Sequence, residues 1–178
     1  MLNLMLTLSI HQTYLTNSTK KDILNMPHIH TEKGQHDHTA SAFTLKHDIK
    51  KNEFRILLHM HKKYGKLLQP GGHIELHESP WEAILHELVE ETGYLAKEMK
   101  VLMHGPISSG LTSETMTFIE GSGLCRVGAG GGDKTESIKV HEVSLDEAES
   151  WLRKMAKNGY LVDPKIYAGL YFLSKSQK

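Results

Sequence analysis

The sequence predicts one α/β or α+β domain, and three observations lead to this class. Several short segments alternate apolar and polar residues, as strands with one buried face do. Other segments carry apolar residues at helical spacing and begin with capping residues. The two kinds of segment are interspersed along a chain of 178 residues, a length that suits one domain or one domain with a small extension.

Residues 1–35 show little periodicity and are interpreted as an N-terminal extension, which leaves residues 36–178 as the folded domain. No apolar run approaches the roughly 20 residues of a membrane span, so no membrane partner is expected. Cys125 is the single cysteine, which excludes an intramolecular disulfide and argues against a Cys-based zinc site. A reducing, cytoplasmic setting is therefore expected.

The charges of the whole chain balance, with 21 Lys and Arg residues against 21 Asp and Glu residues. A protein that coats nucleic acid would carry a basic excess, so we expect no nucleic-acid partner. The balance is uneven, because residues 46–66 are mainly basic and residues 75–98 mainly acidic. These stretches are either two solvated faces or a site where a cation and an anion meet.

The strands are predicted from alternation, apolar content and flanking turn residues. Residues 64–76 are interpreted as a turn, a short strand, a Pro-Gly-Gly break and another strand. A Gly-rich segment at residues 128–133 is expected to be a flexible loop. The remaining predicted strands cover residues 38–47, 53–61, 99–105, 114–124 and 137–143, with a polar turn at 48–52.

The best-specified element is a helix over residues 80–92. Ser79 can cap its N-terminus, Pro80 suits the first helical position, and Glu82 completes a capping box. Gly93 is the expected stop. The apolar residues form one stripe and the glutamates lie on the other side: Ile84, Leu85, Leu88 and Val89 against Glu87, Glu90 and Glu91.

Two more helices are predicted near the C-terminus. The first should begin at Ser144 as its cap, with Glu147 closing a capping box, and end at residues 158–159. The last should begin with Asp163 as its cap and Pro164 at its first position.

Three glutamates on one helical face repel one another, since like charges at i and i+4 destabilise an isolated helix by roughly a few tenths of a kcal/mol. A solvated face would tolerate that cost. The apolar stripe, however, gives the acidic face a fixed direction beside a loop that contains Gly71 and Gly72. Hard divalent cations such as Mg²⁺ take carboxylate and backbone carbonyl oxygens and keep waters for substrate phosphates. The helix and the loop together therefore predict a cation site.

A longer motif contains these residues. Gly72 is followed after five residues by Glu78, and after seven more by the run HELVEETGY at residues 86–94. This spacing resembles the box of the Nudix family, G-x5-E-x7-R-E-U-x-E-E-x-G-U, where U is a bulky apolar residue. Every defining position fits except His86, where the family has Arg.

The resemblance implies a Nudix α/β/α sandwich with a mixed β-sheet. It also implies hydrolysis of a nucleoside diphosphate linked to another moiety, assisted by Mg²⁺ or Mn²⁺. By position, Glu87 and Glu91 resemble the main metal ligands, the Gly71 carbonyl a third ligand, and Glu90 a ligand or a water-orienting catalytic group. The supporting positions of the box are Gly72, Glu78, His86 and Gly93.

His86 departs from the family pattern. The family's Arg is thought to hold the glutamates by charge-assisted hydrogen bonds, whereas histidine is shorter and can be neutral at pH 7. A weaker or pH-sensitive enzyme is one interpretation. A binding module with little or no catalysis is another, although the retained glutamates count against it.

The C-terminal half, from Gly105 to Leu173, resembles the ADP-sugar or ADP-ribose pyrophosphatase branch of the family. In that branch a loop glutamate before the last strand acts as general base or assists the metal, and the matching position is Glu136; the alternative is a solvated loop acid. Glu114 matches a glutamate on the substrate side. The first half looks more like compact Nudix proteins, because it lacks the N-terminal β-subdomain of that branch.

Six histidines form pairs spaced by two, so each pair would share a face in a strand. Such pairs can bind zinc or nickel, but ordinary polar faces are the preferred interpretation because no Cys or fixed acidic partner accompanies them. The pairs are His28 with His30, His36 with His38, and His59 with His61.

The resemblance and the site residues together predict a Nudix hydrolase that cleaves an ADP-sugar-like diphosphate, with ADP-ribose as the first substrate to try. The products would be AMP and a sugar phosphate. Two alternatives stay open: a nucleoside triphosphate pyrophosphohydrolase that sanitises the nucleotide pool, and a catalytically weak nucleotide-binding module. The expected partner is the small-molecule substrate, and a homodimer is left open.

Overall fold

The computed structural model describes residues 38–75, 77–108, 110–132 and 136–176. The N-terminal extension predicted over residues 1–35 lies outside the described residues and stays a prediction.

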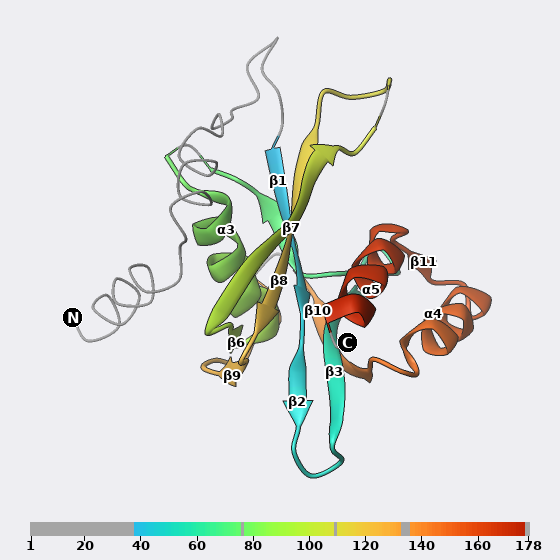
Figure 1. Cartoon of the computed structure of the whole chain (residues 1–178). Helices are drawn as coiled ribbons and strands as arrows, with labels where there is room; N and C mark the ends of the chain where they lie inside the picture. The colour runs from blue at the N-terminus through green and yellow to red at the C-terminus, as the bar shows by residue number, and fades with distance from the viewer. Residues whose placement is uncertain (1–37, 76, 109, 133–135, 177–178) are drawn as a thin grey trace.

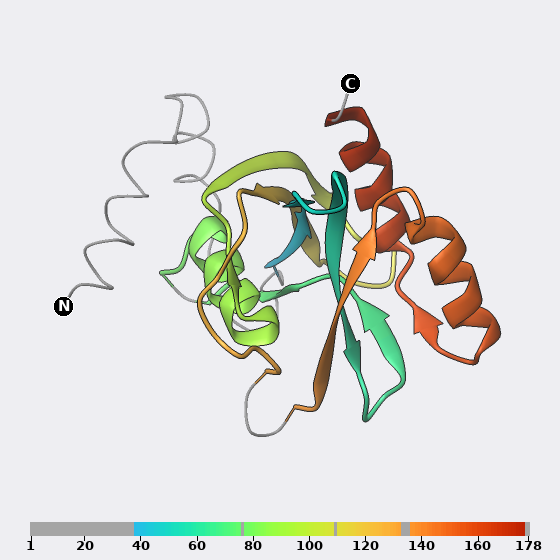
Figure 2. The same ribbon diagram turned by 90° about the horizontal axis from the view of Figure 1, so that it is seen from below.

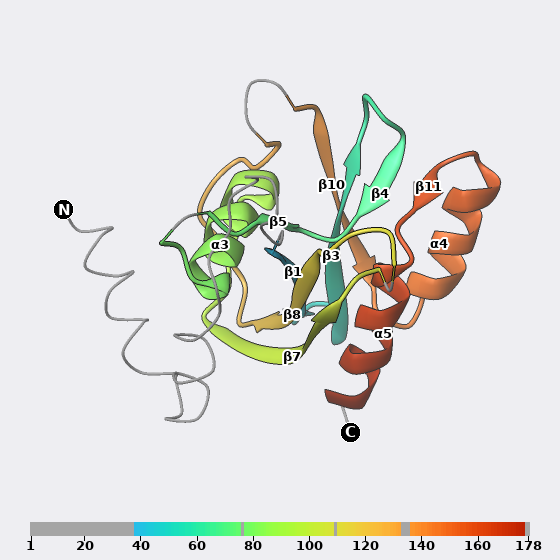
Figure 3. The ribbon, with the colours of Figure 1, turned by 90° about the horizontal axis from the view of Figure 1, so that it is seen from above.

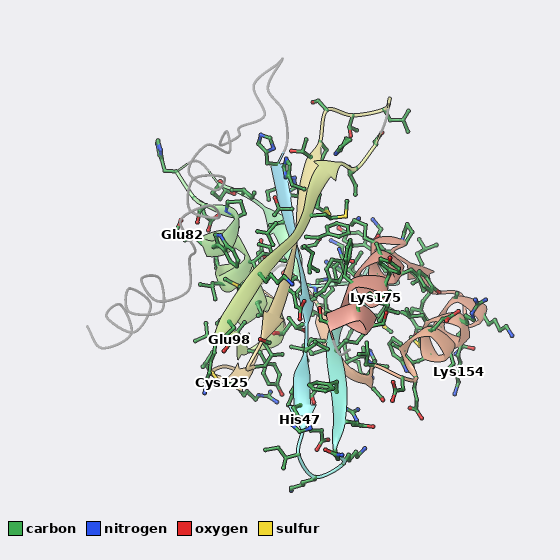
Figure 4. All side chains as sticks on the ribbon, viewed as in Figure 1. His47, Glu82, Glu98, Cys125, Lys154 and Lys175 are labelled. Carbon is green, nitrogen blue, oxygen red and sulfur yellow. The ribbon has the colours of Figure 1, made fainter. Side chains whose placement is uncertain are left out.

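The described elements form three layers. α3 (Pro80–Glu87) covers one side of the β-structure, while α4 (Ala148–Lys157) and α5 (Lys165–Ser176) cover the other (Figure 1). The views from below and from above keep α3 apart from α4 and α5 (Figures 2 and 3). In Figure 4 the labels of Glu82 and Lys154 mark side chains in opposite layers. The expected α/β/α arrangement is confirmed.

The sheet beside α3 has the strand order β5-β1-β8-β7. β1 (His38–Thr44) runs parallel to β8 (Thr115–Ser122) and antiparallel to β5 (Gly71–His73). β7 (Glu98–Pro106) lies antiparallel to β8. The sheet is therefore mixed, as the resemblance implies.

A second sheet has the order β10-β3-β4-β11, with β2 paired to β3. Its long strands, β3 (Glu53–His61) and β10 (Ile138–Ser144), are antiparallel to each other. The short strands are β2 (Lys46–Asp48), β4 (Lys66–Leu68) and β11 (Leu161–Val162).

A separate two-stranded ladder joins β6 (Tyr94–Leu95) to β9 (Cys125–Arg126). Neither strand was predicted, nor was β11, because two residues carry no detectable alternation. They form where backbone segments that are distant in sequence are brought together.

The predicted break between two short strands is confirmed at residues 69–70, between β4 and β5, but the two glycines do not belong to it, because Gly71 and Gly72 form part of β5 itself. A Cβ on Gly71 would lie 2.2 Å from the Ala40 carbonyl oxygen, and the φ of Gly71 is +152°. The two backbones can approach this closely only because residue 71 is glycine.

Alternating side chains of β1 pack into different layers. Ala40 and Ala42 pack with Ile84 of α3. Phe43 points into the core on the side of α5, where its ring centre lies 4.9 Å from that of Phe118. β1 is therefore central to the fold.

β3 divides its side chains in the same way. Ile56, Leu58 and Met60 belong to the core that contains residues of α4 and α5. Leu57 packs instead with Leu88, which follows α3. The odd-numbered positions of β3 thus face the helix that carries the glutamates.

The predicted capping box of α3 is confirmed: the Glu82 N–H donates to Ser79 Oγ (3.3 Å), and the Ser79 N–H donates to Glu82 Oε2 (2.8 Å). The α-helix ends at Glu87, earlier than predicted, and Leu88–Thr92 forms a π-helical turn that Gly93 closes with a φ of 75°. Such a turn re-aims the side chains around it. The change from α-helix to a π-helical turn covers only five residues and leaves the apolar pattern nearly the same, so the sequence did not predict it.

The prediction that Ser144 caps the second helix was wrong. Ser144 is the last residue of β10 and pairs with Arg55, and a turn places the start of α4 at Ala148. The sheet ladder holds Ser144 in an extended strand.

The cap of α5 is confirmed, because Asp163 Oδ1 accepts the Lys165 N–H at 2.8 Å. No helix in the described part of the chain is long and apolar enough to cross a membrane.

Candidate functional site

The glutamates of the box lie where α3 and the π turn pack against β5 and β3. Leu88 is completely buried and Glu91 is 5 % exposed, while Glu87 and Glu90 are partly buried. A fully solvated acidic face therefore does not describe this helix. The packing directs the carboxylates of Glu87 and Glu91 toward β5, and that of Glu91 also toward β3.

Gly72 and Glu87 are in direct contact. A Cβ built on Gly72 would lie 2.0 Å from Glu87 Oε1, closer than any two such atoms can approach. The carboxylate of Glu87 therefore packs on the backbone of β5, and residue 72 must be glycine for it to do so.

Glu91 is held by two other elements. Its Oε2 accepts the backbone N–H of Gly71 at 3.0 Å. The same oxygen lies 3.2 Å from Nδ1 of His59, which is 2 % exposed. Sequence reasoning did not assign His59 to the site. The available signal was its place two residues after Leu57, on the face of β3 that packs under the helix.

The electrostatics of this group are those of crowded, partly desolvated acids. The pKa of Glu87 is raised to about 7, mainly by burial and next by the charge of Glu91; Glu90 and Glu136 add to the rise, and His86 opposes it. Burial also raises the pKa of Glu91, against the lowering effect of His59 and of the Gly71 N–H. The site holds more negative charge than its neighbours neutralise.

His86 lies between two acids of the box. Its Nε2 is 3.0 Å from Glu90 Oε2, and its Nδ1 is 4.0 Å from Glu78 Oε1. Glu78 Oε2 in turn accepts the Glu75 N–H at 3.0 Å. Histidine at this position therefore reaches the acids on both sides of it.

The Gly-rich loop was predicted to be flexible, but its described part, residues 128–132, is bonded to the end of the π turn. The N–H groups of Gly131 and Gly132 donate to the carbonyls of Glu91 and Glu90 at 2.9 and 3.1 Å. These bonds satisfy carbonyl groups that a helix end leaves unpaired.

The loop brings Glu136 to the site. A Cβ on Gly132 would lie 2.2 Å from Glu136 Oε2, so the side chain folds back over the loop. The charge of Glu136 raises the pKa of both Glu87 and Glu91. Glu136 is therefore close enough to interact electrostatically with both glutamates, and its description as a solvated loop acid is incomplete.

Glu114 directly precedes β8 and contacts β1, the strand that lies between β8 and β5. Its Oε1 accepts the Thr39 hydroxyl at 3.0 Å, and Thr39 pairs with His73, the last residue of β5. Its contact is thus with the strand next to the glycines, and its role toward substrate stays a prediction.

The histidine pairs are partly described. His59 contacts Glu91, whereas the ring centre of His61 lies 4.6 Å from that of Tyr64. His28, His30 and His36 lie outside the described residues. Across residues 38–75, 77–108, 110–132 and 136–176, no three side chains of His, Cys, Asp or Glu converge as a metal site.

The donor chemistry nevertheless fits a hard cation. Carboxylates and backbone carbonyls are the ligands that Mg²⁺ and Mn²⁺ prefer, and the excess negative charge favours a cation. The carboxylates of Glu87, Glu90 and Glu91 would have to move closer together to bind one. The direction of the Gly71 carbonyl stays a prediction.

A cavity of about 630 Å³ opens on the other face of the sheet that contains β5. Phe118, Met103 and Ile107 give it apolar walls, and Asp163 lies at the start of α5. Leu68, which also lines it, is three residues before Gly71. The cavity can accept a flat or apolar group near the strand that carries the glycines.

A model of the NUDIX domain matches residues 38–160, and the chain belongs to the Nudix family. The chain is 33% identical to the methanol dehydrogenase activator of Bacillus methanolicus over 110 residues, 58% of each chain. It is 31% identical to the GDP-mannose pyrophosphatase of Enterobacter sp. (strain 638), over 63% of this chain and 58% of that protein. The matches therefore span less than two thirds of these relatives.

The fold is similar to that of a solved ADP compounds hydrolase. The TM-score is 0.61 at 19% sequence identity, covering 78% of this chain and 71% of the other. The similarity supports the fold described above.

Proposed function

We propose that this protein is a Nudix hydrolase that uses Mg²⁺ or Mn²⁺ to cleave the diphosphate of a nucleotide sugar such as ADP-ribose, giving AMP and a sugar phosphate. The observation that carries the proposal is the placement of Glu87 and Glu91 against the backbone of Gly72 and Gly71. Partly buried carboxylates with raised pKa values beside glycine backbone suit a cation that binds phosphate.

The bound cation would neutralise the diphosphate and lower the pKa of a coordinated water. Glu87 and Glu91 would hold it, with Glu90 as a further ligand or as the group that orients water. Glu136 would act as general base or assist the metal from its loop. His86 would keep Glu78 and Glu90 in position.

The substrate class is supported by the GDP-mannose pyrophosphatase relative and by the cavity lined by Phe118 and Met103. An apolar cavity that includes Leu68, three residues before Gly71, suits the base or sugar of a nucleotide sugar. A reducing, cytoplasmic setting and assembly into a homodimer also stay predictions.

One experiment separates the three functions considered. The protein is incubated with ADP-ribose, GDP-mannose and each nucleoside triphosphate, in Mg²⁺, in Mn²⁺ and in chelator. Release of a nucleoside monophosphate and a sugar phosphate supports the proposal. Release of pyrophosphate from a triphosphate alone would indicate a pool-sanitising enzyme, and tight binding without turnover would indicate a binding module.

The variant that tests the site is Glu91→Gln, which removes one charge and retains the shape of the side chain. We expect it to lose cation-dependent turnover. Full turnover by Glu91→Gln in Mg²⁺ would contradict the proposed site.

A further inference from the structure

One oxygen of Glu91 is contacted from two different sheets. Oε2 accepts the Gly71 N–H of β5 at 3.0 Å and lies 3.2 Å from His59 Nδ1 of β3. Both contacts fall on Oε2, so they orient the whole carboxylate. Among the described residues, Oε1 takes no such contact, and this leaves it as the oxygen that can face a ligand.

The ring of His59 has little freedom to move. Its side chain is 3 % exposed, and in the sheet it stands opposite Val140 of β10 and Leu68 of β4. Nδ1 is buried and makes no well-aligned hydrogen bond, so Glu91 Oε2 is the polar atom available to it. Burying a polar nitrogen without a partner is costly, and the contact with Glu91 offsets that cost.

The geometry points to His59 as a positioning residue of the active site: from β3 it fixes Oε2 of Glu91 so that Oε1 is presented to the cation. The inference rests on the proposed function. The residues that orient a metal ligand commonly change metal affinity or activity by roughly 10- to 100-fold when they are replaced.

His61 provides the matched control. It lies two residues further along β3, so the alternation of the strand gives it the same face as His59. Its ring packs on Tyr64 rather than on a glutamate of the box. A general requirement for histidine on this strand would affect both positions, whereas the positioning role concerns His59 alone.

The test compares three variants of the full chain: His59→Leu, which fills the space without a polar atom; His59→Asn, whose amide nitrogen can take the place of Nδ1; and His61→Leu. The measurements are the Kd for Mn²⁺ by calorimetry, a thermal melt in chelator, and KM and kcat for the hydrolysed substrate. The calorimetric Kd requires no turnover.

We expect His59→Leu to weaken Mn²⁺ binding by at least about tenfold, and His59→Asn to remain within about threefold of the wild type. We expect His61→Leu to bind Mn²⁺ normally. The KM for substrate at saturating Mn²⁺ should change little in all three variants, because His59 acts through Glu91.

An unchanged Kd in His59→Leu, or an equal loss in His61→Leu, would overturn the inference. Should His59→Leu fail to fold, His59→Asn keeps the test decisive, since a tenfold loss in that variant would also overturn it. Mn²⁺ binding without any hydrolysis would refute the proposed function and leave the positioning role standing. A wild type that binds no Mn²⁺ would refute both.

Discussion

Gly72 lies directly against the carboxylate of Glu87, at a distance where no side-chain carbon fits: a Cβ would be 2.0 Å from Oε1. The glycine of β5 and the glutamate at the end of α3 are thus complementary in shape. This contact explains why the box has glycine at residue 72 and glutamate at residue 87.

The first prediction follows from that contact. Gly72→Ala should displace the Glu87 side chain and lower kcat by at least about a hundredfold, because a misplaced group near the reacting atoms costs that much. Gly105→Ala is the control, since a Cβ there meets nothing within 4 Å and should leave turnover unchanged. Thermal melts would check that both variants fold. Equal turnover by the two variants would contradict the predicted role of Gly72.

The stability of the metal-free protein should depend on pH through Glu87. Its folded-state pKa is raised from 4.5 to about 7, so between these values the folded state binds more protons than the unfolded state. Stability therefore falls as the pH rises through this window. In chelator, we expect the Tm of the wild type to fall between pH 5 and pH 8. The Tm of Glu87→Gln should fall less over the same pH range. A Tm slope that Glu87→Gln leaves unchanged would rule this out.

Removing the charge of Glu87 should raise stability and lower activity. In chelator at pH 8, we expect Glu87→Gln to melt a few degrees above the wild type, because it no longer ionises a desolvated carboxyl beside Glu91. With Mg²⁺ present, the variant should lose turnover. A variant that is both less stable in chelator and fully active would be inconsistent with the crowded acidic site.

His86 should matter for rate and hardly at all for stability. Its side chain is 65% exposed, so its contacts with Glu78 and Glu90 contribute less than about 0.5 kcal/mol. We expect His86→Ala to lower kcat with an unchanged Tm. Because His86 already reaches Glu90, His86→Arg should raise kcat by no more than about tenfold, which is about 1.4 kcal/mol of barrier. A much larger gain would mean that the histidine impairs the site.

Glu136 is expected to act in the chemical step. Glu136→Gln should lower kcat by roughly 10²- to 10⁴-fold with little change in KM, the usual range for general acid–base catalysis. Glu147→Gln, at an exposed acid before α4, is the control. An effect on KM alone would assign Glu136 to substrate binding instead.

The cavity can be tested at its rim. Met103 lines it and is 43% exposed, so Met103→Asp should fold and should raise the KM for a nucleotide sugar with kcat nearly unchanged. Ile49→Asp makes the same chemical change at a site that is 83% exposed, in the turn between β2 and β3. Equal KM values in the two variants would place the base and sugar elsewhere.

The local elements of the box were predictable because their interactions are close in sequence. The Ser79–Glu82 capping box spans one helical turn, and the apolar stripe of α3 determines which face packs. The early end of α3 at Glu87 and the extended Ser144 were not predictable. Pairing with Arg55 of β3 holds Ser144 in an extended strand, and the residues around Ser144 do not reveal a partner that is so distant in sequence.

From the sequence alone we predict which groups could bind a cation, because the spacing from Gly72 to Glu91 indicates a helix, its cap and its acids. Only the tertiary structure decided which other groups surround those acids. His59 comes from β3, and nothing in the sequence assigned it to the site. Glu136 was expected from the resemblance, but its approach to Glu87 and Glu91 follows from the folding of the loop before β10. The physical reason is that contacts between distant segments depend on how the sheets pack, whereas caps and stripes depend on neighbours along the chain.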